Sequence, residues 1–131
     1  MSTAIKDNRA PGFAKNPDKR IELKREGKRI TVTVGGIVVA DSTDAVTMLE
    51  TGGYQPVHYF PSAHIRPGAL TRTEKSSHCP YKGHATYWTI EAGGKRLDDA
   101  AWSYETPYDE MAEITGRIAF YGDKVDGIKV G

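Results

Sequence analysis

The sequence predicts a mainly β fold: one β-rich α+β domain with a barrel-like or sandwich-like sheet and one or two short helices. Three observations carry this prediction. Runs of β-branched residues alternate with polar ones, the period-two pattern of a half-buried strand. Gly-Gly pairs separate several of these runs, as expected for tight turns. The chain has 131 residues, of which 38% are hydrophobic, which is enough for one domain with one core.

The first expected elements are a hairpin, a third strand and a fourth, shorter one. Residues 30–34 (ITVTV) and 37–41 (IVVAD) flank Gly35-Gly36. Two glycines between β-branched runs favour a two-residue turn with positive φ. Residues 45–50 (AVTMLE) are the next expected strand, and residues 57–61 (VHYFP) form a short strand that a proline ends.

The middle of the chain lacks a regular pattern. Residues 62–82 contain three prolines or glycines and mixed polarity, and we expect a long irregular segment with a short helical turn at residues 65–70. Loops of this length are uncommon in compact domains and often carry function. The segment is therefore a candidate site region.

Regular pattern returns in the last third of the chain. Residues 84–91 and 98–105 are expected to be partner strands around a Gly-Gly turn. Pro107 precedes a short helix at residues 108–114, whose acidic first turn suits the helix dipole. Residues 116–121 and 125–130 are the final expected strands.

The charge is unevenly distributed along the chain. The formal net charge is only +1, but residues 1–30 contain nine Lys or Arg and four Asp or Glu. Residues 1–22 are polar and aperiodic, so we expect a flexible basic N-terminal arm followed by a single β-rich domain over residues 23–131. The excess charge is interpreted as a solvated tail, with binding of an anionic partner as the alternative.

Composition excludes several classes of protein. No apolar run reaches 18 residues, so we expect no membrane span. The first residues lack the apolar segment of a signal peptide, and we expect a cytoplasmic protein. The small net charge gives no reason to expect nucleic acid as a partner. We predict no cofactor.

The segment from Ser77 to Gly83 (SHCPYKG) has the highest density of reactive groups. Cys79 and Lys82 are candidate catalytic residues, because a nearby cation lowers the pKa of a thiol. Neighbouring side chains of an extended chain point to opposite faces, so adjacency does not make His78 the base for Cys79. A buried, inert cysteine is the structural alternative. The four histidines and Cys79 match no short metal-binding motif, and no metal site is predicted.

Aromatic residues indicate a pocket for a small ligand. The chain has seven tyrosines and three phenylalanines, so its aromatic walls carry many hydroxyl groups. Arg66 and Lys82, at the ends of the middle segment, are expected to hold an anion together. Ordinary packing of tyrosines at the rim of a sheet is the alternative. The candidate ligand-binding residues are Tyr59, Arg66, Lys82, Tyr87, Trp102, Tyr104 and Tyr121.

Several motifs resemble the domain of unknown function 427 family. They cover roughly residues 28–130 in order, and the Cys-Pro-Tyr-Lys-Gly block is the most specific. The resemblance implies a small, mainly β protein of a family found mostly in bacteria and fungi. Some labels of this family mention nucleotidyltransferase, but the resemblance supplies no catalytic set. The matching stretches are Val34–Gly36, Ala40–Ser42, Tyr59–Pro61 with Arg66, Cys79–Ala85, Ala101–Tyr104 with Pro107, and Ile114–Tyr121.

Two classes of function follow from these observations. The first is a small-molecule-binding protein for a polar or anionic metabolite or nucleotide, and the sequence leaves open whether it is also an enzyme. The second is a non-catalytic interaction module, such as a homodimer that pairs through exposed strand edges. A pocket with converging Arg, Lys and Tyr side chains favours the first class, and a flat apolar patch favours the second.

Overall fold

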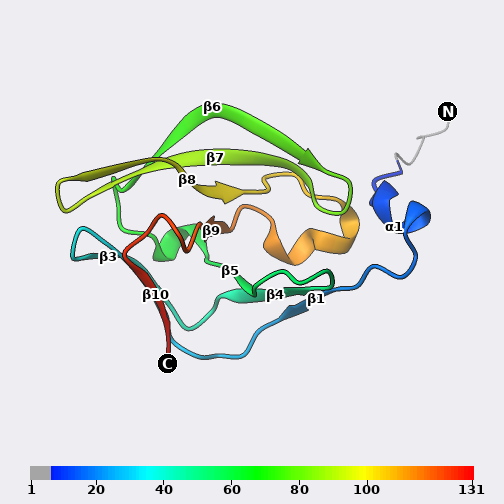
Figure 1. The fold of residues 1–131 in the computed structure, drawn as a ribbon, viewed down its shortest axis with the longest axis horizontal. Helices are drawn as coiled ribbons and strands as arrows, with labels where there is room; N and C mark the ends of the chain where they lie inside the picture. Colours follow the sequence, from blue (N-terminus) through cyan, green and yellow to red (C-terminus); the bar gives the residue numbers. More distant parts are fainter. Residues whose placement is uncertain (1–6) are drawn as a thin grey trace, which may run out of the picture.

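The computed structural model describes residues 7–131 and is mainly β, with short helical pieces only (Figure 1). Residues 1–6 of the predicted arm lie outside the described residues. The helical elements are α1 (Pro11–Lys15) and the 3-10 helices η1 (Ser62–His64) and η2 (Asp109–Ile114). The strands are β1 (Ile21–Lys24), β2 (Ile30–Val34), β3 (Ile37–Ser42), β4 (Val46–Glu50), β5 (Val57–Tyr59), β6 (Leu70–Cys79), β7 (Gly83–Ala92), β8 (Lys95–Ser103), β9 (Ile118–Phe120) and β10 (Gly127–Val130).

The strands form three antiparallel sheets, in the orders β1-β4-β5, β10-β2-β3 and β6-β7-β8-β9. A bridge between Phe60 and Ile118 links the end of β5 to β9 and so connects the first sheet to the third. Figure 1 shows β6, β7 and β8 along one side of the molecule, β1, β4 and β10 on the other, and β5 and β9 between them. No sheet of the described residues closes on itself, so the fold is sandwich-like and the barrel alternative is wrong.

Alternation along β9 and its neighbours creates two cores. Ile118 and Phe120 belong to the first core, which packs against the sheet of β2, β3 and β10. Ala119, which lies between them, belongs to the second core. In the same way, Phe60 belongs to the first core and Tyr59 to the second. Successive strand residues point to opposite faces, so these strands are covered on both sides. We call the second core the tyrosine core, because it contains Tyr59, Tyr87 and Tyr104.

Most predicted elements are confirmed, with shifted ends. The hairpin of β2 and β3, the strands β4, β7, β9 and β10, and the short helix at residues 109–114 occur where the pattern placed them. β8 begins three residues earlier than predicted, at Lys95, directly after the Gly-Gly turn. The turn pair Gly35 and Gly36 has the positive φ values that the sequence predicted.

The prediction of a long irregular segment at residues 62–82 is wrong. Residues 70–79 form β6, and the helical turn is η1 at residues 62–64, before the predicted position. β6 is an edge strand paired only with β7, and most of its side chains are exposed. An edge strand with a solvated face needs no apolar alternation, so its sequence does not differ from that of a loop. A register shift between Arg72 and Ser76 interrupts its pairing further.

The described part of the N-terminal segment is in contact with the domain. The backbone N–H of Gly12 donates to the carbonyl of Pro80 at 2.9 Å, and that of Ala10 donates to Glu110 Oε1 at 2.8 Å. The rings of Phe13 and Tyr81 meet edge to face, with centroids 5.0 Å apart. β1 begins at Ile21, inside the range assigned to the arm. These contacts connect the segment to the domain at a few points. They do not test how flexible the segment is, so its flexibility stays a prediction.

A comparison of two glycine substitutions tests the packing of the turns. Gly93 lies against the backbone of Gly35, and a Cβ at Gly93 would collide with it, whereas a Cβ at Gly94 would meet nothing within 4 Å. Both glycines have positive φ, so Gly94→Ala should cost about 1–2 kcal/mol of unfolding free energy through backbone strain alone. Gly93→Ala should cost about 1–3 kcal/mol more, because of overpacking. Urea unfolding measures the difference, and equal losses would contradict this packing.

Candidate functional site

The feature of greatest chemical interest is a cavity of about 580 Å³ beside the tyrosine core. Six of the seven predicted ligand-binding residues line it: Tyr59, Lys82, Tyr87, Trp102, Tyr104 and Tyr121. They come from β5, β7, β8, the residue that follows β8, the β6–β7 turn and the segment after β9. β7 and β8 are neighbours in the third sheet, whereas β5 belongs to the first, so the cavity has lining residues from more than one sheet.

Four aromatic side chains form one continuous wall of the cavity. The rings of Trp102 and Tyr121 lie with centroids 4.4 Å apart, and Tyr59 meets Trp102 edge to face at 6.3 Å. Tyr104 is tilted against Tyr59 at 6.4 Å. Aromatic pairs in such geometries add about 0.5–1.5 kcal/mol beyond the burial of their area. The wall is therefore rigid, and it presents flat apolar faces.

The hydroxyl groups of this wall are hydrogen-bond donors. Burial raises the pKa of Tyr59 and of Tyr104 well above the usual range, so both phenols keep their protons at neutral pH. Burial and the neighbouring Tyr87 hydroxyl raise the pKa of Tyr121 to about 12. Tyr59 Oη accepts a long hydrogen bond of 3.4 Å from Trp102 Nε1, which leaves its own proton available.

The Tyr104 hydroxyl has no hydrogen-bond partner within residues 7–131. Among the same residues, no side-chain N or O atom is both fully enclosed and without a partner. Tyr104 lines the cavity, which offers space beside its side chain. A polar group in this position is satisfied by water or by a ligand.

A cluster of three charges lies at the Lys82 end of the cavity. Lys82 Nζ donates to Glu50 Oε1 at 2.8 Å, and Lys19 Nζ lies 2.8 Å from Glu50 Oε2. The exposed fractions of the three side chains are only 10–15%. Burial raises the pKa of Glu50, but hydrogen bonds from Lys19 and Lys82 outweigh it and hold that pKa below its usual value. Glu50 is therefore a carboxylate at neutral pH.

His58 lines the cavity from β5 and is fixed by a neighbouring strand. Its Nδ1 lies 2.8 Å from Thr47 Oγ1, the residue that faces it across the β4–β5 pair. Burial lowers the pKa of His58. The imidazole is therefore neutral at pH 7, and it adds a polar but uncharged edge to the cavity.

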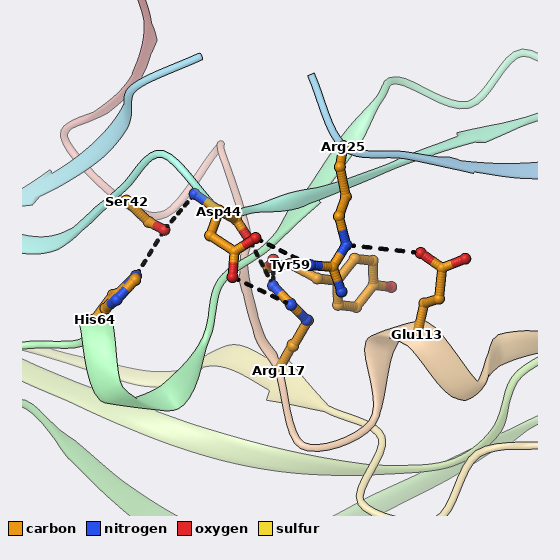
Figure 2. A network of polar contacts seen from close by, with 7 residues as sticks. All are labelled: Arg25, Ser42, Asp44, Tyr59, His64, Glu113 and Arg117. Atoms are coloured by element: carbon orange, nitrogen blue, oxygen red, sulfur yellow. Dashed lines mark hydrogen bonds and ion pairs between the residues drawn. The ribbon is translucent and has the colours of Figure 1, made fainter. Parts of the chain in front are cut away.

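A polar network fixes the backbone behind Tyr59 (Figure 2). Arg117 Nη1 donates to the carbonyl of Asp44 at 2.6 Å and, more weakly, to that of Tyr59 at 3.5 Å. Figure 2 shows Arg25 between Asp44 and Glu113, at 3.1 and 3.8 Å. The Arg117 side chain is 12% exposed, so its hydrogen bonds hold the start of β4 and the end of β5 in a protected position. The network thus supports the wall from outside the cavity.

Arg66 is separated from the other predicted residues. It lines a different, shallower hollow with residues of β3 and η1, among them Asp41 and His64. Its backbone N–H donates to the carbonyl of Val39 at 2.7 Å, which ties this part of the chain to β3. The expected anion site shared by Arg66 and Lys82 is therefore not formed. That expectation assumed one long loop with both residues at its ends, and β6 now occupies most of that length.

Cys79 ends β6 and is partly buried, opposite Gly83. It is not among the residues that line the cavity, although its thiol is close enough to contribute to the raised pKa of Tyr59 and Tyr104. His78 Nε2 lies 2.7 Å from the hydroxyl of Tyr108 and is not bonded to the thiol. His78 is thus paired with Tyr108, and its adjacency to Cys79 in the sequence creates no hydrogen bond between these two described side chains.

Sequence reasoning missed three residues of the site: Lys19, Glu50 and His58. Lys19 lies in the segment that was interpreted as a solvated tail, and Glu50 ends an expected strand without any motif around it. His58 was considered only as a metal ligand. Nothing in the local sequence distinguishes these residues from surface charges, because their roles depend on pairing between distant strands.

Two further properties concern the described residues alone. Within residues 7–131, no group of three His, Cys, Asp or Glu side chains converges to hold a metal ion. The helices of this part are short pieces, and none has the length and apolar character needed to cross a membrane.

The neutral state of His58 predicts a pH dependence of stability. Its pKa is lower in the folded protein than the ordinary value of 6.5, so the unfolded chain binds more protons in this range. The unfolding free energy should therefore fall as the pH is lowered from 7.5 through 6.5 to 5.5. His58→Gln should flatten this fall, and His84→Gln, at an exposed position, serves as the control. Denaturant titrations at several pH values give the slopes, and a wild-type curve that rises on acidification would contradict the assignment.

A protein family matches most of the chain. A family model described as domain of unknown function (DUF427) matches residues 22–131. No curated protein matches the chain. The matched range contains every residue that lines the cavity. It confirms the resemblance found in the Cys-Pro-Tyr-Lys-Gly block and its companions, and the chain belongs to the DUF427 family.

Proposed function

We propose that the protein binds a small polar molecule with an anionic group, such as a nucleotide or a phosphorylated metabolite, in the cavity beside the tyrosine core. One observation carries the proposal: Lys82, Tyr59 and Tyr104, whose side chains have hydrogen-bond donors to offer, line one cavity together with five further aromatic residues and the carboxylates of Glu50 and Asp123. Ligand sites commonly combine apolar walls with a few convergent polar groups.

The polarity of these groups indicates the polarity of the ligand. The phenols keep their protons, and Lys82 has three N–H groups, of which Glu50 accepts one. Glu50, the carboxylate at the same end, already accepts from two lysines. The unused capacity of this end is therefore for donation, which suits phosphate or carboxylate oxygens. Flat aromatic faces suit the ring of a base or another planar group.

The interaction-module alternative has weaker support. The large hydrophobic residues exposed among the described residues are Val38, Tyr54 and Val130. They lie on β3, on the loop after β4 and on β10. Single exposed apolar residues are normal on a monomer, whereas a docking surface needs a contiguous patch. A cytoplasmic location, expected from the first residues of the chain, belongs to the same proposal.

The proposal stops at binding. Nucleophilic catalysis can use a hydroxyl, a thiol, a lysine amine or a carboxylate, provided that a neighbouring base or a shifted pKa activates it. Among the described residues that line the cavity, Lys82 is already paired with Glu50, and no Ser, Thr or Cys is present. Candidate catalytic roles for Cys79 and Lys82 thus stay predictions from the sequence.

A thermal-shift screen over nucleotides, sugar phosphates and aromatic carboxylates tests the proposal, since ligand binding raises the unfolding midpoint. For a compound that shifts the midpoint, calorimetry should show that Lys82→Met weakens binding about tenfold or more, because a charge-assisted hydrogen bond is lost. Tyr104→Phe should weaken it about threefold to tenfold.

Arg66→Ala is the matched control, because it removes a cation outside this cavity and should leave the affinity unchanged. No shift with any anionic compound would contradict the proposal. A shift that Arg66→Ala abolishes and Lys82→Met does not would move the site to the hollow at η1.

A further inference from the structure

Lys19 belongs to the charge cluster of the cavity but not to the family domain. The family match begins at residue 22, and Lys19 precedes it. Its ammonium nevertheless lies 2.8 Å from Glu50 Oε2, at the end of β4, with a side chain only 10% exposed. The N-terminal segment thus supplies a charge to a site that the rest of the chain builds.

Several contacts hold Lys19 in this position. Its Nζ donates to the carbonyl of Thr51 at 2.8 Å and lies 4.7 and 5.3 Å from the ring centroids of Tyr54 and Tyr81. The segment before it is anchored on the turn that carries Lys82, through the hydrogen bond from Gly12 to Pro80. A Cβ at Gly12 would meet the Tyr81 ring at 2.7 Å, so this approach depends on a glycine. These contacts therefore hold Lys19 in a defined position beside Glu50.

Lys19 changes the net charge of the cluster that it forms with Glu50 and Lys82. Lys82 and Glu50 alone form a neutral pair, in which the carboxylate fully compensates the cation facing the cavity. With Lys19 on the second carboxylate oxygen, two ammonium groups share one carboxylate, and the cluster has a formal charge of +1. The attraction of a charge is strong where side chains exclude water, and all three groups are largely buried.

We propose that Lys19 is a specificity-determining residue: it takes part of the charge of Glu50 and thereby leaves Lys82 free to bind an anionic group of the ligand. Lys19 acts through Glu50 and does not line the cavity. The inference rests on the proposed function, because it assigns the charge preference of that same cavity. Without Lys19, Glu50 would fully compensate Lys82, and the affinity of the cavity for an anionic group would be lower.

Coupling between the two sites is reciprocal. If Lys19 strengthens anion binding at Lys82, a bound anion must stabilise the docked N-terminal segment by the same factor. Amide hydrogen exchange in residues 11–20 should therefore slow when an anionic compound saturates the cavity. A neutral compound of the same shape should leave this exchange unchanged.

The test uses two pairs of probes: adenosine 5′-monophosphate with adenosine, and benzoate with benzyl alcohol. Calorimetry on the full chain should show that Lys19→Met weakens binding of the anionic member about tenfold and changes binding of the neutral member less than twofold. Lys19→Arg retains the charge and should keep the anionic affinity within about threefold. Lys24→Met is the matched control, since it removes an exposed cation from the adjacent strand.

Each outcome decides between distinct conclusions. Equal losses for both members of a pair would mean that Lys19 only supports the wall, and unchanged affinities would overturn the inference while leaving the proposed function intact. Failure of both anionic probes to bind the unaltered protein would overturn the inference and the proposed function together. If Lys19→Met does not fold, hydrogen exchange on the unaltered protein decides, and exchange that does not slow with the anionic probe refutes the inference.

Discussion

The architecture depends on one short pairing, between Phe60 and Ile118. Each residue donates its backbone N–H to the carbonyl of the other at 2.8 Å. This pair joins the sheet of β4 and β5 to the sheet of β7 and β8, so that β9 lies inside a continuous set of strands. Strands covered on both sides must carry apolar residues on both faces, and all three residues of β9 are buried.

The same pairing explains where the cavity lies. Because side chains alternate, the residue next to Phe60, which is Tyr59, must point away from the first core. Tyr87, Trp102 and Ala119 point the same way from the neighbouring strands. The cavity lies beside the side chains on this face. Arg117 then holds the two strand ends from behind.

The carboxylate of Glu50 is stabilised by ion pairs with Lys19 and Lys82. An isolated buried carboxylate would cost several kcal/mol, and a single lysine opposite Glu50 would offset that cost without leaving any excess charge. Two lysines stabilise the carboxylate and also leave a cation at the cavity. This arrangement requires the N-terminal segment to stay docked, because Lys19 belongs to that segment.

The sequence by itself determined the elements and most of the cavity wall. Period-two alternation and Gly-Gly turns are local signals, and they located β2, β3, β4, β7 and β9, together with the tyrosines and Trp102 that these patterns place on one face. Only the tertiary structure decided that residues 70–79 form a strand, because an edge strand with a solvated face has no apolar pattern. It also decided that Lys82 meets Glu50 and Lys19 while Arg66 lies elsewhere. The two charge pairs join residues 31 and 32 positions apart in the chain, and no local pattern in the sequence records such contacts.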